Sequence, residues 1–270
     1  MFRFLRQELI IFLSSVRFNT RIIVPSWVEH SDELLASSTR YFPLVGWIVS
    51  AITTIVFYGS SFLFPVSVSV VLAVSASVLS TGAFHEDGFT DMCDGFGGGW
   101  DKERILEIMK DSRIGVFGTI GILLMLFLKV ACYIALAESS LLLLFFAIWI
   151  SHSSSRFSAN VMAKLLPYAR EDQLSKAKPI VKSMKLSDVL FSWIWVLGPI
   201  VFFLYYPGEF SNRIAMILLL SFSLQALGVF YLRGFYKKWL GGYTGDCLGA
   251  VQQVTEILFL LGLIATWKYY

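Results

Sequence analysis

The sequence predicts an all-α, polytopic membrane protein, a bundle of about seven transmembrane helices. Its composition is the first observation: 56% of the 270 residues are hydrophobic and 15% are charged, with a mean hydropathy of +0.69. A soluble domain has about 25% charged and about 45–50% apolar residues. The apolar excess excludes a disordered chain, a collagen-like fibre and an ordinary soluble enzyme. The net charge of +3 is too small to indicate a nucleic-acid-binding protein.

The second observation is a set of seven segments with the length and apolar character of membrane spans, which need about 17–25 residues. They cover residues 42–64, 66–84, 114–137, 141–163, 189–206, 214–232 and 248–267. Little more than Pro65 separates the first two segments, which predicts a tight helical hairpin. Residues 138–140 alone join the third and fourth segments.

The third observation is where the basic residues lie. Alternating the spans places 19 of the 22 lysines and arginines in one set of loops, namely 1–40, 85–113, 156–186 and 233–247. The opposite loops hold only Arg213 and Lys268. Because cytoplasmic loops carry the excess of basic residues, these large loops are predicted to face the cytoplasm, as part of an inner-membrane protein whose C-terminus lies outside.

The N-terminal arm, residues 1–40, precedes the first span. Apolar residues recur there at helical spacing, with arginines between and beside them: Leu5, Leu9, Phe12 and Val16, with Arg3, Arg6, Arg17 and Arg21. This pattern is typical of a helix that lies in the lipid headgroup plane, and we predict one over residues 2–20. The whole chain, 1–270, is interpreted as one membrane domain.

Three aspartates in the acidic loop or helix 85–113 carry the strongest chemical signal. Asp87, Asp91 and Asp94 stand at i, i+4 and i+7, so on a helix their carboxylates share one face. A divalent cation is the simplest way to offset their repulsion at a membrane boundary, and hard oxygen ligands favour Mg²⁺, Mn²⁺ or Ca²⁺. Mg²⁺ usually takes one or two carboxylates together with substrate phosphates, which predicts a phosphate or diphosphate ester as substrate. A solvated acidic loop is the alternative.

Two arginines and one more aspartate are candidates at the predicted membrane edge. Asp111 could complete the metal site and Arg113 could bind a phosphate, although Arg113 could equally be an interfacial arginine. Arg156 lies within the fourth span, where a charge is costly, so it is predicted to clamp a phosphate. Lys129, deep in the third span, either pairs with Glu256 or extends to the membrane surface.

A glycine-rich turn at 241–246 precedes the last span. It contains Thr244, Gly245 and Asp246, and a glycine-rich turn that leads into a helix exposes free N–H groups suited to an anion. An N-capping aspartate after a glycine turn is the alternative. Together with the acidic stretch, this turn indicates metal-assisted phosphoryl transfer.

Several stretches closely resemble the cobalamin synthase family. The paired motifs are H-E-D-G-F-T-D-M-C-D-G at 85–95 and K-D-S-R-I-G at 110–115. Further matches are R-Y-F-P-L-V-G at 40–46, P-Y-A-R-E at 167–171 and G-G-Y-T-G-D-C-L-G-A at 241–250. They run in order along nearly the whole chain.

The resemblance implies a membrane-bound, Mg²⁺-requiring phosphotransferase. Its substrates would be adenosylcobinamide-GDP and α-ribazole or α-ribazole 5′-phosphate, and GMP would be released as the nucleotide loop of cobalamin is closed. Carried onto this chain, Asp87, Asp91 and Asp94 would bind metal, and Asp111 and Asp246 would be further ligands or the base. The substrate-binding residues implied are Arg113, Arg156, Arg40, Thr244 and Gly245.

Two other functions are alternatives to a phosphotransferase of the cobalamin synthase family. A CDP-alcohol phosphotransferase also uses aspartates on membrane helices, but its usual Ala-Arg after the second aspartate and glycine is missing after Asp94-Gly95. A transporter should carry polar residues across the midplane and show repeat symmetry. The polar residues here gather on one side, which disfavours transport. The oligomeric state is left open.

Overall fold

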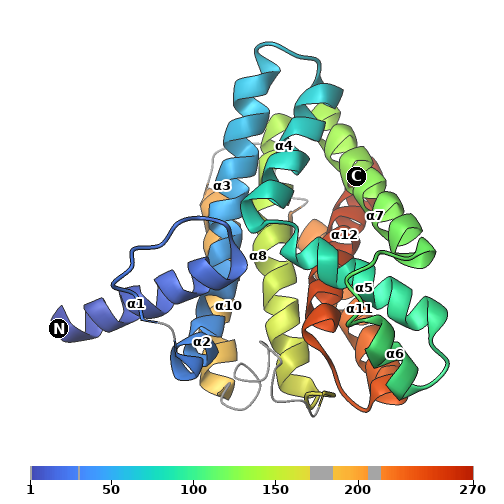
Figure 1. Ribbon diagram of the computed structural model, residues 1–270. Helices are drawn as coiled ribbons and strands as arrows, with labels where there is room; N and C mark the ends of the chain where they lie inside the picture. The colour runs from blue at the N-terminus through green and yellow to red at the C-terminus, as the bar shows by residue number, and fades with distance from the viewer. Residues whose placement is uncertain (1, 30, 171–184, 206–213, 270) are drawn as a thin grey trace.

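The computed structural model describes residues 2–29, 31–170, 185–205 and 214–269, and these residues form helices joined by short connections (Figure 1). The helices are α1 (Phe2–Asn19), α2 (Asp32–Ser38), η1 (Thr39–Tyr41), α3 (Phe42–Ser61), α4 (Val66–Thr81), α5 (Phe84–Gly98), α6 (Lys102–Ile108), α7 (Val116–Ser139), α8 (Leu141–Leu165), α10 (Leu186–Tyr205), α11 (Ile214–Leu240) and α12 (Gly245–Tyr269). Some residues used in the sequence argument lie outside the described residues: Glu171, Tyr206, Arg213 and the three lysines between 171 and 184. The predicted all-α fold class is confirmed.

Within the residues that the structure describes, six helices are long and apolar enough to cross a membrane, or seven if the bent pair of α4 and α5 counts as one span. The predicted second span, 66–84, needs correction. The α4 helix ends at Thr81 because Gly82 caps it in the left-handed conformation (φ 65°), and α5 then leaves at 88° to α4. The sixth span is also longer than predicted, since α11 continues beyond residue 232 to Leu240.

Two tight connections follow the sequence prediction. The α3 helix ends at Ser61 with Phe62 as its C-cap, and Pro65, three residues later, is the N-cap of α4, which gives the predicted hairpin. Ser140 is both the C-cap of α7 and the N-cap of α8, and its side-chain oxygen accepts the backbone N–H of Leu143. The antiparallel order of these neighbours follows from such short links.

The bundle is organised around α8 and α12, where 72% of each apolar stretch is buried, compared with 28–39% in the other candidate spans. Figure 1 shows α8 in the middle of the bundle. Small residues allow close packing there. A Cβ on Gly46 of α3 would lie 2.7 Å from the backbone oxygen of His152, and one on Gly262 of α12 would lie 2.7 Å from Cα of Ser221. This kind of packing is typical of membrane helices.

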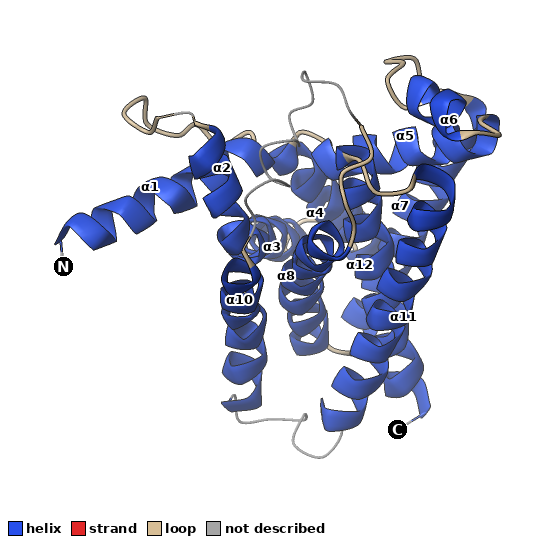
Figure 2. Ribbon diagram, turned by 90° about the horizontal axis from the view of Figure 1, so that it is seen from below, coloured by secondary structure: helices blue, strands red, loops and turns tan. Residues whose placement is uncertain are grey.

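The predicted N-terminal helix over 2–20 is confirmed as α1, which projects from the bundle (Figures 1 and 2). Figure 2 shows α1, α2, α5 and α6 at one end of the bundle, opposite the C-terminus. Glu8 ties α1 to the bundle because it accepts hydrogen bonds from Arg40 (2.8 Å) and from the hydroxyl of Tyr41 (2.7 Å). The motif-bearing segment 85–113 therefore lies at the same end as the N-terminal arm.

Candidate active site

The α5 and α12 helices cross at two glycines. A Cβ on Gly88 of α5 would lie 3.0 Å from Cα of Asp246, and a Cβ on Gly249 of α12 would lie 3.0 Å from the backbone oxygen of His85. Any larger residue at either position would push the two helices apart. The glycines therefore allow the aspartates of α5 to approach Asp246, which is 159 positions after Asp87 in the printed sequence.

We call Asp87, Asp91, Asp94 and Asp246 the carboxylate cluster. The charges that act on Asp91 are those of Asp246, Asp87 and Asp94, with Arg170 as the opposing positive charge. Within the described parts of the chain, no three acidic, histidine or cysteine side chains converge closely enough to hold a metal ion by themselves. A cation at this cluster would need further oxygen ligands from a bound substrate or from water.

Asp94 makes contacts that sequence spacing alone does not indicate. Its two carboxylate oxygens accept the backbone N–H groups of Gly115 (2.7 Å) and Gly118 (2.8 Å). Asp94 thus satisfies free donors at the start of α7, where a negative charge is favourable. The structure gives it a helix-capping contact, and its role as a metal ligand stays a prediction.

Asp246 is held in place by two neighbours. Arg170 donates from Nη2 to its Oδ2 at 2.8 Å, and the hydroxyl of Thr244 donates to the same oxygen at 3.2 Å. The Thr244 oxygen also accepts the backbone N–H of Cys247, so Thr244 caps α12 as well. Thr244 is fully buried and orients Asp246, and its role in binding the substrate stays a prediction.

A short backbone pairing brings Arg170 to this place. The N–H of Ala169 donates to the oxygen of Tyr243 at 2.8 Å, and the N–H of Tyr243 donates to the oxygen of Pro167 at 3.0 Å. Glycine is needed at 242, because a Cβ there would collide with the same Pro167 oxygen. The segment after α8 is thereby fixed beside the glycine-rich turn.

A cavity of about 340 Å³ opens beside the cluster, which is within the usual range of about 300–1,000 Å³ for ligand sites. Asp87, Arg170, Gly245 and Asp246 all line it. The remaining lining comes from α1, α2, η1, α3, α5, α8, α12 and residue 168. Two carboxylates and an arginine thus face a space of ligand size.

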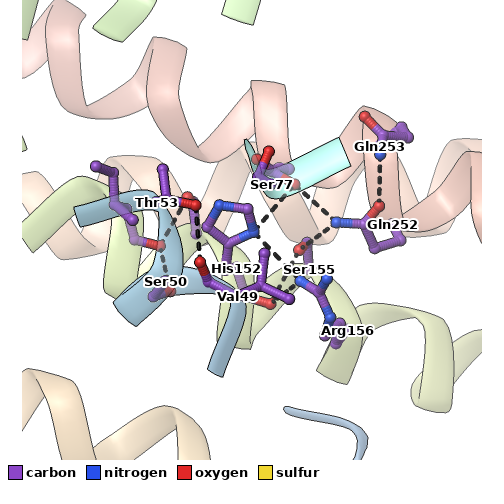
Figure 3. A network of polar contacts seen from close by, with 12 residues as sticks. Val49, Ser50, Thr53, Ser77, His152, Ser155, Arg156, Gln252 and Gln253 are labelled. Atoms are coloured by element: carbon purple, nitrogen blue, oxygen red, sulfur yellow. Dashed lines mark hydrogen bonds and ion pairs between the residues drawn. The ribbon is translucent and has the colours of Figure 1, made fainter. Parts of the chain in front are cut away.

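Arg156 does not line this cavity, and its role as a phosphate clamp stays a prediction. It is 1% exposed. Its Nη1 donates to the backbone oxygen of His152 at 2.9 Å, and its guanidinium lies 5.7 Å from the ring centre of Phe42. Figure 3 shows Arg156 beside His152, and Ser155 in contact with Gln252 of α12. Its hydrogen bonds go to His152, one turn earlier on α8, and the negative charges that act on Arg156 are those of Glu256 and Glu86.

The interior around Arg156 is a buried polar network. Lys129 and Glu256 form an ion pair at 2.9 Å, so the first of the two alternatives for Lys129 is confirmed. Gln252 donates to Glu256 at 2.7 Å, and Gln253 donates to Glu86 at 2.8 Å. These side chains surround a void of about 10 Å³, roughly the space for one water molecule. The network links α5, next to the carboxylate cluster, to α7, α8 and α12.

Three further residues predicted to act on the substrate pair elsewhere. Arg40 forms ion pairs with Glu8 (2.8 Å) and Asp188 (3.6 Å), which joins the N-terminal arm to α10. Asp111 and Arg113 pair with each other at 2.6 Å, and the Arg113 side chain is 88% exposed. The hydrogen bonds from Arg113 lower the pKa of Asp111 to about 2. None of the three lines the cavity, and their catalytic roles stay predictions.

Arg170 is the residue at the cavity that sequence reasoning missed. Its segment, P-Y-A-R-E at 167–171, belongs to the resemblance, but no local pattern distinguishes Arg170 from other loop arginines. One feature of the sequence could have indicated Arg170: it is a basic residue in a motif shared with the family, and this motif lies outside the predicted spans. Its partner, Asp246, is 76 positions away, so the pairing is visible only in the fold.

Comparison with known proteins agrees with the resemblance seen in the sequence. The family model described as cobalamin-5-phosphate synthase, CobS, matches residues 11–264. Proteins named adenosylcobinamide-GDP ribazoletransferase match along nearly their whole length. The protein from Leptospira interrogans is 48% identical over 264 residues, covering 98% of each chain. The one from Shewanella amazonensis is 42% identical, covering 97% of this chain and 98% of the relative. No solved structure matches. The chain therefore belongs to the cobalamin-5-phosphate synthase family.

Proposed function

We propose that this protein joins adenosylcobinamide-GDP to α-ribazole or α-ribazole 5′-phosphate and releases GMP. The relatives are named adenosylcobinamide-GDP ribazoletransferase, after this reaction. The observation that carries the proposal is the meeting of Asp87 from α5 with Asp246 from α12 and Arg170 at one ligand-sized cavity. Phosphoryl transfer depends on such convergence, because positioning and charge supply most of the catalysis.

Mg²⁺ is the cofactor we propose for this site, and the donor chemistry fits it. Asp87, Asp91 and Asp246 offer hard carboxylate oxygens, while a complete protein-only metal site is missing from the described residues. Mg²⁺ commonly takes one or two carboxylates and completes its shell with phosphate oxygens and water. When bound, it would offset the negative charge that grows on the phosphate oxygens.

The chain's own residues have separate tasks in the proposed transfer. A ribose hydroxyl of the acceptor attacks the phosphorus attached to cobinamide. A new P–O bond forms, the P–O bond to GMP breaks, and GMP leaves with its electron pair. The hydroxyl proton passes to a carboxylate at the cavity wall, Asp87 or Asp246. Arg170 lines the cavity and carries a guanidinium that can donate to a phosphate oxygen.

The proposed location is the inner membrane, with the carboxylate cluster facing the cytoplasm. Of the 22 lysines and arginines, 19 fall in residues 1–40, 85–113, 156–186 and 233–247, although Arg156 among them is buried within α8. The acidic segment 85–113 lies at the end of the bundle opposite the C-terminus. The bias of basic residues toward cytoplasmic loops supports this orientation.

The function is tested by GMP release from the full chain in membranes. With adenosylcobinamide-GDP, α-ribazole and Mg²⁺ present, we expect GMP and the cobalamin product in equal amounts. Removing divalent cations with a chelator should abolish both, and added Mg²⁺ should restore them. GMP release that does not need the acceptor would instead indicate a hydrolase, and no release under any condition would reject the proposal.

Substituting alanine for Gly88 should lower turnover about 100-fold, because a misplacement of about 1 Å at reacting groups can have that effect. The new Cβ would press on the backbone of Asp246 at 3.0 Å, so α5 and α12 must separate. Gly234→Ala in α11 is the matched control, since a Cβ there meets nothing within 4 Å. Rates of GMP release from equal amounts of folded protein give the comparison. Equal rates for the two variants would contradict the close crossing.

A further inference from the structure

The cavity beside the carboxylate cluster has two chemically different parts. Its charged residues, Asp87, Arg170 and Asp246, come from α5, from the segment after α8 and from α12. Its apolar residues come mainly from α1, α2, α3, α5 and α8, and include Phe18, Leu35, Phe42, Phe84 and Ala163. A ligand that fills the cavity therefore meets charge at one part and an apolar surface at the other.

The apolar part is built from rings in mutual contact. Phe18 and Phe84 meet edge to face at 5.4 Å, and Phe84 meets His85 in the same way at 5.5 Å. His85 is stacked on Phe42 at 5.6 Å with an angle of 14° between the rings. Such connected rings form a surface that suits another flat, apolar ring system.

Three polar side chains of the lining use their donors on nearby backbone, whereas Nε2 of His85 is buried and has no hydrogen-bond partner within the described residues. Asn160 donates to the oxygen of Thr39 at 2.8 Å, and Asn19 donates to the oxygen of Ser15 at 2.9 Å. The hydroxyl of Ser38 likewise donates to Leu35 at 2.7 Å. A base rich in hydrogen-bonding groups, such as guanine, would find few free partners here, whereas a benzimidazole with apolar edges needs few.

The size of the cavity restricts the ligand further. A volume of about 340 Å³ is near the lower end of the usual range for ligand sites, which corresponds to a molecule of drug or nucleoside size. A corrin ring with its side chains and a nucleotide is several times larger. The corrinoid part of the donor must then lie outside this cavity.

We infer that the aromatic part of this cavity binds the flat, apolar base of the acceptor nucleoside and directs its ribose toward Asp87 and Asp246. This inference rests on the proposed function. It assigns Phe42, Phe84 and Ala163 to acceptor specificity, and it places the corrinoid and the departing GMP outside the aromatic part.

Steady-state kinetics with Ala163→Leu tests the assignment, because the larger side chain fills the cavity without removing a contact. We expect the KM for α-ribazole to rise about 10-fold or more, the usual effect of a few methylene groups in an apolar site. The KM for adenosylcobinamide-GDP should change less than about twofold. The KM for an acceptor with imidazole in place of the fused ring should rise much less in Ala163→Leu. Ala131→Leu, at an exposed position of α7, is the matched control.

A second variant and a binding measurement test the inference independently, in case Ala163→Leu does not fold. Phe84 is 44% exposed at the cavity, so Phe84→Ala is expected to fold and to weaken equilibrium binding of radiolabelled α-ribazole, whereas Phe127→Ala, 67% exposed on α7, should not. A higher KM for the donor with an unchanged KM for the acceptor would overturn the inference, as would unchanged values for both. If the wild-type protein itself releases no GMP, the proposed function fails first, which is a distinct outcome.

Discussion

Asp91→Asn is expected to reduce GMP release about a thousand-fold or more, the upper part of the range for loss of one preorganised electrostatic group. Asp91 lies among the charges of Asp87, Asp94 and Asp246, so it is the central member of the carboxylate cluster. Asparagine keeps the shape but removes the charge that would bind a cation. The loss should appear in kcat, measured with saturating substrates and Mg²⁺.

The matched control makes the same chemical change on the neighbouring helix. Asp101 accepts the N–H of Arg104 at 2.9 Å and caps α6. Asparagine caps helices about as well as aspartate, so Asp101→Asn should retain near-normal turnover. Near-normal turnover of Asp91→Asn with Mg²⁺ would mean that the cluster is assigned to the wrong chemistry.

Lys129→Met is expected to destabilise the protein by about 3–5 kcal/mol, as is usual when one partner of a buried ion pair is removed. Lys129 is 1% exposed and Glu256 is fully buried, so the glutamate left behind cannot be hydrated. For a chain of this size, that loss corresponds to a decrease of about 6–20 °C in the midpoint of thermal unfolding. The midpoint is measured in detergent by intrinsic fluorescence.

A double variant distinguishes loss of the ion pair from a general loss of core packing. Lys129→Met combined with Glu256→Met removes both charges, and buried pairs replaced by apolar residues are often close to neutral. We expect the double variant to unfold at a higher temperature than Lys129→Met alone. If the two losses simply add, the ion pair at 2.9 Å does not hold the two helices together.

Hydropathy predicted most of the bundle because lipid requires long apolar helices whose backbone groups bond internally. The fourth span, expected at 141–163, is α8 from Leu141 to Leu165. Hydropathy did not predict the end of α4, which is set by the backbone conformation. The residues around Gly82 are apolar or small, so they look like part of a span, yet the left-handed conformation at Gly82 and Ala83 ends α4 and turns the chain.

The candidate site was predictable only in part. The spacing of Asp87 and Asp91 follows from helix geometry, and the glycine-rich turn pointed to Asp246. The pairing of Arg170 with Asp246 joins segments 76 residues apart, and local sequence does not encode it. For Arg156, a charge within a span indicates function by default, but the sequence did not show that the side chain would be buried beside His152 and a polar network.

Mn²⁺ binding followed by electron paramagnetic resonance tests most directly whether α5 and α12 share one cation site. The detergent-solubilised protein is titrated with Mn²⁺ in the presence of adenosylcobinamide-GDP, with Asp101→Asn as control. We predict one tightly bound Mn²⁺ per chain, with affinity reduced about 10-fold or more in both Asp91→Asn and Asp246→Asn. Wild-type affinity in Asp246→Asn would contradict a site shared by the two helices.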